Sequence, residues 1–298
     1  MKSRTLIQLA AAVNAAGTAI PVAAAAQSAA PRFDDVRLST GIRLRYAEQG
    51  NGPAEPIILL HGLSDSWFSF SGVLPLLSVQ RRVYALDLRG HGNSDRPATG
   101  YHPRDLAADV VAFLDAKRID RATILGHSMG SFVAQQVVAI APNRISRLIL
   151  VGSATSARAF NGMAEFEAAA KALRDPVPTA FLREFQVSTI HQGVSDEFID
   201  RAVAESSKLP ARVWGPLVDG LLAAELPPTI ATLGIPTLVL WGEKDAYASR
   251  TEQDALVRRI RSASLKAYPN TGHAPHWERP AVFASDVLAF VARPVASP

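Results

Sequence analysis

Short apolar runs alternate with longer amphipathic stretches along most of this 298-residue chain. The apolar runs, rich in Ile, Val and Leu, fall at residues 57–60, 83–86, 122–125, 148–151, 237–240 and 265–268. Stretches with helical periodicity lie near residues 66–77, 104–117, 128–140, 253–261 and 280–292. Continuous apolar strands between helices are typical of a mostly parallel sheet that helices cover on both faces. The pattern therefore predicts an α/β fold.

Two regions depart from this alternation. Residues 32–48 alternate polar and apolar positions around Thr40-Gly41, which predicts an antiparallel hairpin at a sheet edge. Residues 156–226 show no convincing strand but have helical stretches near 163–173, 178–190, 196–207 and 212–224. We expect them to form a helical cap, inserted after the sixth strand of a core that comprises residues 32–155 and 227–293.

Composition narrows the class of protein. The chain is 48% hydrophobic and 19% charged, as expected for one large and well-buried domain. A net charge of +4, without a basic run interleaved with aromatic residues, argues against a nucleic-acid partner. The absence of cysteine excludes disulfides, thiol chemistry and cysteine-bound metals. We expect neither a metal nor an organic cofactor.

The N-terminus predicts export. Lys2 and Arg4 precede an Ala-rich apolar run over residues 6–26, and Ala24-Ala25-Ala26 offers a small-residue cleavage signal. Residues 1–26 therefore resemble a secretory signal peptide, with an uncleaved anchor or a disordered extension as the alternatives. The mature protein would be periplasmic or secreted. No later segment has about 18 unbroken apolar residues, so no membrane partner is expected. The sequence leaves a monomer and a homodimer open.

The sequence Gly126-His127-Ser128-Met129-Gly130 follows an apolar run and opens a helical stretch. A serine with glycines two positions before and after it, between a strand and a helix, is the nucleophile-elbow pattern. Glycine is needed at both flanks because strand and helix approach too closely for side chains there. The motif predicts an exposed Ser128 hydroxyl beside the amide of Met129, which can donate to a developing oxyanion.

A serine nucleophile needs a base and a carboxylate that orients the base. We expect His273 to be the base because it lies in a polar loop after a predicted strand, with His276 as its rival. Asp245 directly follows the buried strand at residues 237–242 and is the expected acid, with Glu243 as the alternative. A cap or turn function for Asp245 is the structural alternative.

The second oxyanion donor is expected after another strand. The apolar run at residues 56–60 ends in His61-Gly62-Leu63, and Gly62 would let the backbone turn toward the nucleophile. The Leu63 amide is the predicted donor, together with that of Met129. We expect His61 to hold this loop by hydrogen bonds, with direct contact to substrate as the alternative.

Taken together, these motifs resemble those of α/β-hydrolase fold enzymes. The matching segments are residues 61–62, 87–94, 126–130, 241–245 and 272–280, in the order found in that family. The resemblance implies a doubly covered, mostly parallel sheet of the α/β-hydrolase type and a Ser128–His273–Asp245 triad. It further implies a small-molecule acyl substrate: a carboxylic ester, a lactone or a similarly activated acyl compound, cleaved through an acyl-enzyme intermediate.

Several aromatic residues are candidates for the substrate pocket. We expect only two or three of the cap's apolar side chains to meet substrate, while the rest pack the cap onto the core. The candidate pocket residues are His61, Trp67, Phe160, Phe181, Phe185 and Trp214.

Relatives with other chemistry resemble the chain less well. Haloalkane dehalogenases and epoxide hydrolases have aspartate where this chain has Ser128, and residues 156–226 contain no tyrosine of the kind that epoxide hydrolases need. Carbon–carbon bond hydrolases of ring-cleavage products share the triad and remain the main alternative. They usually have Trp where this chain has Ala274 and Gly where it has Ser131. Perhydrolases and a ligand-binding relative without turnover are further alternatives.

Overall fold

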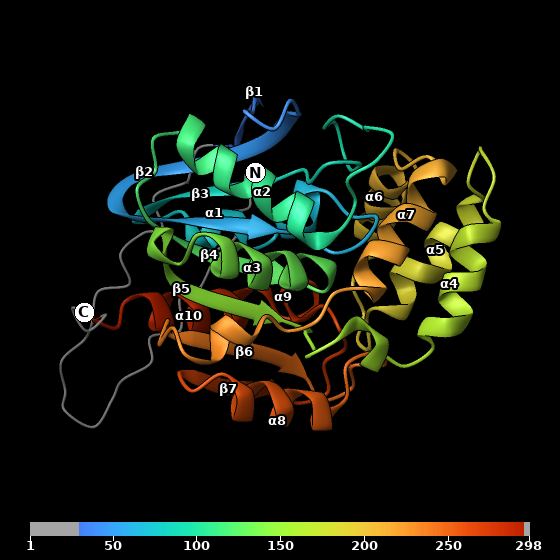
Figure 1. Cartoon of the computed structure of the whole chain (residues 1–298). Helices are drawn as coiled ribbons and strands as arrows, with labels where there is room; N and C mark the ends of the chain where they lie inside the picture. The colour runs from blue at the N-terminus through green and yellow to red at the C-terminus, as the bar shows by residue number, and fades with distance from the viewer. Residues whose placement is uncertain (1–29, 295–298) are drawn as a thin grey trace, which may run out of the picture.

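The computed structural model describes residues 30–294, which form one continuous sheet with helices on both faces and a group of helices at one end (Figure 1). The sheet has seven strands, with the spatial order β1-β2-β4-β5-β6-β7 and with β3 paired to β2. Their bounds are β1 Arg32–Arg37, β2 Arg43–Leu60, β3 Arg81–Leu86, β4 Ala122–His127, β5 Ile145–Val151, β6 Thr237–Gly242 and β7 Ala263–Tyr268. All pairs from β4 to β7 are parallel, and β1 is antiparallel to β2. The predicted fold class is confirmed.

The strand β2 contains both the second arm of the predicted hairpin and the predicted strand at residues 57–60. It turns back at Gly50, where φ is +81°, and both of its ends pair with β3. A Cβ at Gly50 would lie 2.2 Å from the Arg81 carbonyl oxygen, so the close approach requires glycine. Since β2 is a single strand, the cap follows the fifth strand in chain order. The sequence analysis placed it after the sixth strand because it divided β2 into two strands.

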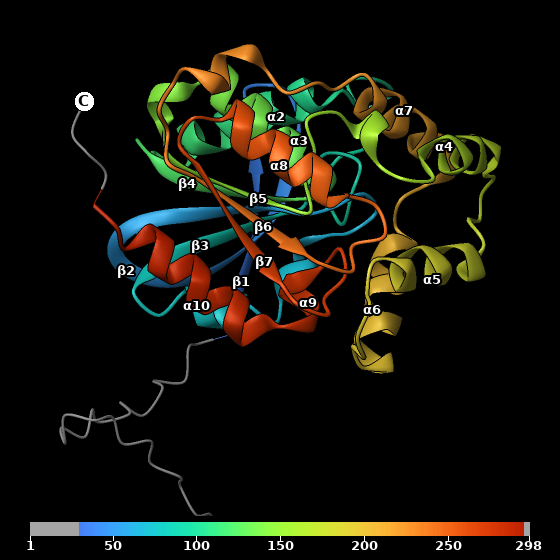
Figure 2. The same ribbon diagram turned by 90° about the horizontal axis from the view of Figure 1, so that it is seen from below.

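Helices cover the two faces of the sheet (Figure 2). One face carries α2 (Pro103–Ala116), α3 (Met129–Ile140) and α8 (Arg250–Arg259), and the other carries α1 (Leu74–Leu77), α9 (Pro275–Glu278) and α10 (Pro280–Val291). Each face has its own apolar cluster, so the strands are buried on both sides. The helix predicted over residues 66–77 is broken into a 3₁₀ turn at Trp67–Phe70 and the short α1, with Gly72 between them.

The cap helices are α4 (Met163–Ala172), α5 (Thr179–Ser188), α6 (Asp196–Ser206) and α7 (Ala211–Leu222). They gather beyond the arrowheads of the strands, at the carboxyl edge of the sheet (Figure 1). Ser195 accepts a hydrogen bond from the Phe198 amide and is the N-cap of α6. A bridge between Ser156 and Glu225 joins the two ends of the insertion. The cap therefore covers the edge where parallel α/β sheets bind their ligands.

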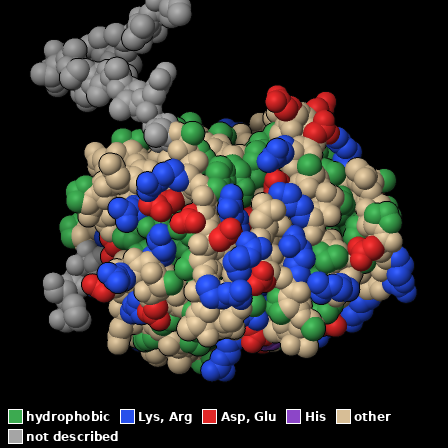
Figure 3. Space-filling model, turned by 90° about the horizontal axis from the view of Figure 1, so that it is seen from above, with side chains coloured by type: hydrophobic (Ala, Val, Ile, Leu, Met, Phe, Trp, Pro, Cys, Tyr) green, Lys and Arg blue, Asp and Glu red, His purple; other side chains and the backbone are tan. Residues whose placement is uncertain are grey.

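The molecular surface carries mixed charge. The face in Figure 3 shows Lys and Arg side chains interspersed with Asp and Glu. Among residues 30–294, no helix has the length and apolarity needed to span a bilayer. The predicted signal peptide, residues 1–26, lies outside the described residues, and export stays a prediction.

Candidate active site

Ser128 lies between β4 and α3 with a strained backbone. Its φ is 50° and its ψ is −120°, a conformation that L-residues rarely adopt. A Cβ at Gly126 would lie 2.1 Å from the Gly130 carbonyl oxygen, and one at Gly130 would lie 2.2 Å from that of Leu60. The two glycines therefore let β4, α3 and β2 converge beneath the serine, as the motif predicts.

The surroundings of Ser128 hold this strained conformation. Its amide donates to the Val151 carbonyl oxygen at 2.9 Å. Its own carbonyl oxygen accepts from the Ser131 amide at 2.8 Å and from the Ser131 hydroxyl at 2.6 Å. Strain of this kind, typically about 1–3 kcal/mol, persists only where the surrounding structure fixes it, and it is common at active sites.

His273 and Asp245 form a hydrogen-bonded pair. The distance from His273 Nδ1 to Asp245 Oδ2 is 2.8 Å, and the Asp245 side chain is fully buried. Asp245 Oδ1 accepts from the amides of Tyr247 at 2.8 Å and Ala248 at 2.9 Å. An acceptor on Nδ1 places the imidazole proton there and leaves Nε2 as the basic atom.

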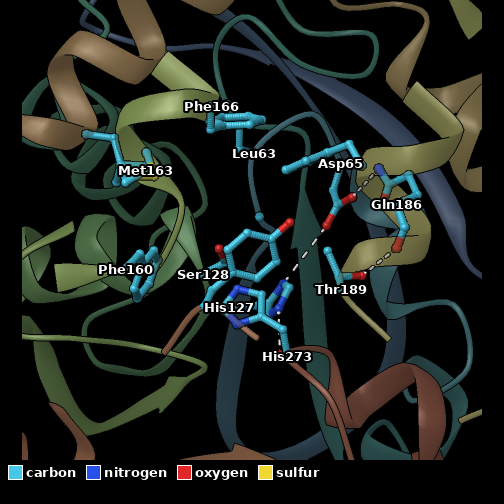
Figure 4. A pocket seen from close by; sticks show the side chains of 14 residues that line it. Leu63, Asp65, His127, Ser128, Phe160, Met163, Phe166, Gln186, Thr189 and His273 are labelled. Carbon is cyan, nitrogen blue, oxygen red and sulfur yellow. Dashed lines mark hydrogen bonds and ion pairs between the residues drawn. The ribbon is translucent and has the colours of Figure 1, made fainter. Parts of the chain in front are cut away.

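Ser128 and His273 line the same pocket, and Figure 4 shows both among the side chains around it. No hydrogen bond joins their side chains within residues 30–294, so a direct proton transfer requires the two groups to come within hydrogen-bond distance. Hydrogen bonds between catalytic groups are often loose without substrate and tighten when it binds. The arrangement can supply a hydroxyl, a base and an orienting carboxylate to one bound molecule.

Gly152, which sequence reasoning missed, positions the imidazole. It follows β5 with a φ of +53°, and a Cβ there would lie 2.8 Å from His273 Nδ1. The imidazole also packs between the rings of Phe160 and Tyr247, with ring centroids 5.8 and 5.1 Å away. A glycine at the end of a buried strand next to the nucleophile strand was the available signal.

The alternative acid and base lie elsewhere. His276 is buried outside the pocket lining, and its Nε2 lies 3.1 Å from Ser69 Oγ. Burial lowers the pKa of His276 to about 3, so the ring is neutral at ordinary pH. Glu243 is exposed, whereas the Asp245 carboxylate contacts the imidazole. Of the four candidates, the structure brings together His273 and Asp245.

The two predicted oxyanion donors, the amides of Leu63 and Met129, come from two loops near the pocket. Leu63 lines the pocket from the loop after β2. Met129 is the first residue of α3 and is buried directly after Ser128. Neither amide donates a hydrogen bond within the described part of the chain. Both are therefore available to an oxygen that binds at the helix N-terminus.

The pocket encloses about 510 Å³ of empty space, part of it open to solvent. Its apolar lining comes mainly from the cap, which contributes Phe160, Met163, Phe166, Phe185 and Leu221, while Leu63 contributes from the core. Phe160 and Phe185 were among the predicted pocket residues. The volume and the apolar wall suit a small organic ligand.

Two other predicted pocket aromatics lie behind this wall. Trp214 is fully buried and packs edge-on against Phe166, Phe181 and Phe185, with centroids 6.3, 5.5 and 6.0 Å away. Its Nε1 donates to the Leu209 carbonyl oxygen. Phe181 packs against Trp214 and Phe166 and is not part of the lining. Both residues support the side chains that face the pocket, because a cap of four short helices needs its own apolar core.

His61 and Trp67 also lie outside the lining. His61 Nδ1 donates to the Gly62 carbonyl oxygen at 2.7 Å, and its Nε2 accepts from the Leu88 amide at 3.0 Å. Full burial lowers the pKa of His61 well below its usual value, so the neutral ring joins two loops. Trp67 packs against Phe33, with ring centroids 4.6 Å apart, and against the apolar cluster on the face of the sheet that carries α1 and α10.

A polar wall that the sequence did not predict faces the apolar one. Figure 4 shows Asp65, Gln186 and Thr189 on the side of the pocket opposite Phe160 and Met163. Gln186 Nε2, from α5, donates to Asp65 Oδ1 at 3.0 Å. Burial raises the pKa of Asp65 to about 6. The available signal was a carboxylate two residues beyond the predicted oxyanion donor Leu63.

Within residues 30–294, no group of three or more His, Cys, Asp or Glu side chains is arranged to hold a metal ion. The side chain of Asp87 holds the loop over residues 87–94. Its Oδ1 accepts from the Trp67 amide and its Oδ2 from the Asn93 amide, both at 2.8 Å. Asp87 therefore has a structural role in this loop.

Comparison with known proteins places the chain in a family. The family described as alpha/beta hydrolase fold matches residues 55–280. The chain is 30% identical over 273 residues to a 2-hydroxymuconate semialdehyde hydrolase of Pseudomonas sp. (strain CF600), covering 86% of this chain and 92% of that protein. It is 29% identical over 255 residues to an acetyltransferase component of the acetoin cleaving system of Cupriavidus necator, but spans only 66% of that protein's length.

Solved structures of other proteins have a similar fold. An esterase from Rhodococcus sp. ECU1013 superposes with a TM-score of 0.79 at 26% identity, over 87% of this chain and 98% of that one. An esterase from Exiguobacterium antarcticum superposes with a TM-score of 0.78 at 20% identity, over 88% of this chain and 100% of that one. The fold and these relatives support hydrolase activity. By the match over residues 55–280, the chain belongs to the α/β-hydrolase fold family.

Proposed function

We propose that this protein is a serine hydrolase that cleaves a carboxylic ester, a lactone or a similarly activated acyl compound. The observation that carries the proposal is the 2.8 Å bond between His273 Nδ1 and Asp245 Oδ2, in an imidazole that shares a pocket with the strained Ser128. Because Nδ1 is engaged with Asp245, this arrangement leaves the imidazole Nε2 to accept the serine proton.

In the proposed mechanism, Ser128 Oγ attacks the substrate carbonyl carbon while His273 Nε2 takes the hydroxyl proton. The Asp245 carboxylate stabilises the resulting imidazolium. The Leu63 and Met129 amides donate to the tetrahedral oxyanion, and one such donor is typically worth about 3 kcal/mol. The imidazolium then protonates the departing alcohol. A water molecule, activated by His273, hydrolyses the acyl-enzyme and regenerates Ser128.

The polarity of the pocket favours a neutral or cationic substrate over an anionic one. Its lining contains the carboxyl group of Asp65 and neither Lys nor Arg. A buried carboxylate without a cationic neighbour repels anions. The substrates of ring-cleavage hydrolases such as the muconate semialdehyde relative carry carboxylates. The same triad acting on a carbon–carbon bond is therefore the second candidate, and the charge of the pocket counts against it.

Turnover of p-nitrophenyl acetate by the wild type and by Ser128→Ala tests the proposal. The wild type should release p-nitrophenol continuously, and the variant should lose activity by several orders of magnitude while keeping its circular dichroism spectrum. Ser207→Ala, at the exposed serine that directly follows α6, is the matched control and should keep full activity. Near-normal hydrolysis by Ser128→Ala would refute the mechanism.

Three further measurements distinguish the alternative functions. Faster turnover of a coloured dienol ring-cleavage product than of any ester would establish the carbon–carbon bond hydrolase. Labelling of Ser128 by a fluorophosphonate without turnover of any ester would indicate a ligand-binding relative. Dependence of turnover on added peroxide would indicate a perhydrolase.

A further inference from the structure

The polar wall of the pocket contains an unusual excess of hydrogen-bond acceptors. Gln186 Nε2 is already engaged with Asp65 Oδ1 at 3.0 Å, with Ser206 Oγ at 2.7 Å and with Ser64 Oγ at 3.4 Å. The Thr189 hydroxyl donates to the Gln186 carbonyl oxygen at 2.7 Å. The N–H and O–H groups of Gln186 and Thr189 are thus in use, while Gln186 Oε1 accepts no hydrogen bond within residues 30–294.

His127 adds a buried acceptor without a partner. Its Nε2 lies 3.1 Å from the His273 carbonyl oxygen, so Nε2 carries the proton and donates it there. The other ring nitrogen, Nδ1, is therefore a bare lone pair. It is buried without a hydrogen bond and lies 3.9 Å from Asp65 Oδ2. Two acceptors that face each other at this distance call for a donor between them or beside them.

Asp65 is held firmly in this position. Its Oδ2 accepts from the Ser69 hydroxyl at 3.1 Å, and its side chain is 6% exposed. No Lys or Arg lines the pocket, so the carboxylate has no cationic partner there. The Gly62 backbone amide is a third hydrogen-bond donor to this carboxylate, after Gln186 and Ser69. A carboxylate has about four acceptor positions, so one lone pair is left, and leaving it unsatisfied in a buried site is costly.

We propose that Asp65, Gln186 and His127 form a subsite that binds a hydrogen-bond donor on the substrate, either a hydroxyl or a protonated amino group. The inference deepens the proposed function and rests on it. The oxyanion amides of Leu63 and Met129 offer donors to the carbonyl oxygen, and the polar wall offers acceptors to a second group. The apolar side chains opposite take the hydrocarbon part. The substrate is thus a hydroxy or amino ester of modest size.

Pairs of esters that differ only in this group test the subsite. Ethyl 3-hydroxybutanoate, ethyl 3-aminobutanoate and ethyl 3-methylbutanoate place a hydroxyl, an ammonium and a methyl group at one position. Two further pairs change the position of the group. The pair of ethyl lactate and ethyl 2-methylpropanoate moves it along the acyl chain, and the pair of 2-hydroxyethyl butanoate and propyl butanoate moves it to the alcohol. The readout is kcat/KM in a pH-stat, divided by the rate of alkaline hydrolysis of the same ester.

In at least one pair, the donor-bearing ester should exceed its methyl isostere by about tenfold or more, because a site built around hydrogen bonds rejects a partner that lacks them. Comparison of kcat/KM for the hydroxy and amino esters then shows which donor the subsite prefers. Equal rates, or preference for the methyl isostere in every pair, would overturn the subsite. If p-nitrophenyl acetate is not hydrolysed through Ser128, the proposed function fails and the subsite with it.

Substitutions in the polar wall test whether its residues cause the preference for donor-bearing esters. Asp65→Asn keeps the shape but turns one acceptor into a donor, and Gln186→Met removes Oε1 from the cap side. Each should lower the ratio of donor-bearing to methyl ester by about tenfold, whatever happens to the absolute rate. Glu197→Gln makes the same change of carboxylate to amide at an exposed position of α6 and should leave the ratio unchanged. If Asp65→Asn fails to fold, the subsite is still tested by Gln186→Met and by the ester pairs measured with the wild type. An unchanged ratio in Gln186→Met would contradict the subsite.

Discussion

The core and the cap bound the same pocket by different physical means. On the core side, backbone contacts fix the candidate catalytic groups: Ser128 is held by Val151 and Ser131, and a Cβ at Gly152 would collide with His273. On the cap side, Phe166 is positioned by other rings, with Phe185 stacked at 5.0 Å and Trp214 behind it.

This difference implies a division of roles. Backbone hydrogen bonds and glycine contacts leave few alternative positions, so changes on the core side should disturb chemistry steeply. Aromatic side chains that pack on one another tolerate substitution with repacking, so changes on the cap side should shift selectivity gradually. The following predictions test that division, from the largest effect to the smallest.

Asp245→Asn should cause the largest loss of activity on the core side. An amide at this position can donate to Nδ1, which would move the imidazole proton to Nε2 and remove the base, and the comparable change in a serine protease costs about 10,000-fold in kcat. The measurement is kcat for p-nitrophenyl acetate. Glu243→Gln, the exposed carboxylate of the same loop, is the control and should keep full activity. Similar losses in both variants would remove Asp245 from its assigned role.

Gly152→Ala should displace the imidazole without touching its chemistry. The added methyl would lie 2.8 Å from His273 Nδ1, and a shift of about 1 Å in a catalytic group can cost about 100-fold in rate. Gly234→Ala is matched, since that glycine also has positive φ, at +64°, but no neighbour within 4 Å of the new Cβ. It should cost only about 1–2 kcal/mol of stability. Equal activity in the two variants would contradict the role of Gly152.

Substitutions in the cap should change which ester is preferred. Phe166→Leu enlarges the pocket and should move the preferred acyl length upward, changing the ratio of kcat/KM for long and short p-nitrophenyl esters by about tenfold. Phe181→Leu removes a ring that packs against Phe166 from outside the lining, and should change that ratio by less than about threefold. A 1,000-fold fall in kcat for either variant would show that the cap also holds the catalytic groups.

The loss of folding stability at low pH should come from titrating side chains in the core rather than in the cap. Burial lowers the pKa of four histidines in the core: His61, His91, His127 and His276. On unfolding below about pH 6.5 they bind protons, so each reduces stability by up to about 1.4 kcal/mol per pH unit. Asp65 and Asp87, whose pKa burial raises to about 6, act in the opposite direction between about pH 4 and pH 6.

Because the histidines outnumber these two carboxyls, the free energy of unfolding should fall as the pH drops from 6.5 to 5. Urea denaturation at pH 7 and at pH 5 measures the change. A midpoint that is unchanged or higher at pH 5 would mean that the histidines are not held neutral in the folded chain.

The sequence predicted the parts of the site that local backbone geometry dictates. Ser128 was predictable because only glycine fits at positions 126 and 130. Asp245 was predictable because it leaves the end of a buried strand. The pairing of this loop with the loop of His273 follows from the parallel order of β6 and β7, since their carboxyl ends meet at one edge of the sheet.

The rest depended on tertiary packing. Phe166 and Phe181 are chemically identical and both lie on amphipathic helices, yet Phe166 faces the pocket and Phe181 lies behind it. That choice depends on how four helices dock, which periodicity along one helix does not determine. Gln186 was missed for the same reason, because its partner Asp65 is 121 residues away in the sequence.

Mapping the residue that reacts with a fluorophosphonate tests the central claim most directly. Peptide mass spectrometry should find a single phosphonylated residue, Ser128, with loss of ester hydrolysis in proportion to labelling. The adduct should form far more slowly in Asp245→Asn, in which the base is misoriented. An active enzyme that is labelled at another serine, or that is not labelled at all, would contradict the account.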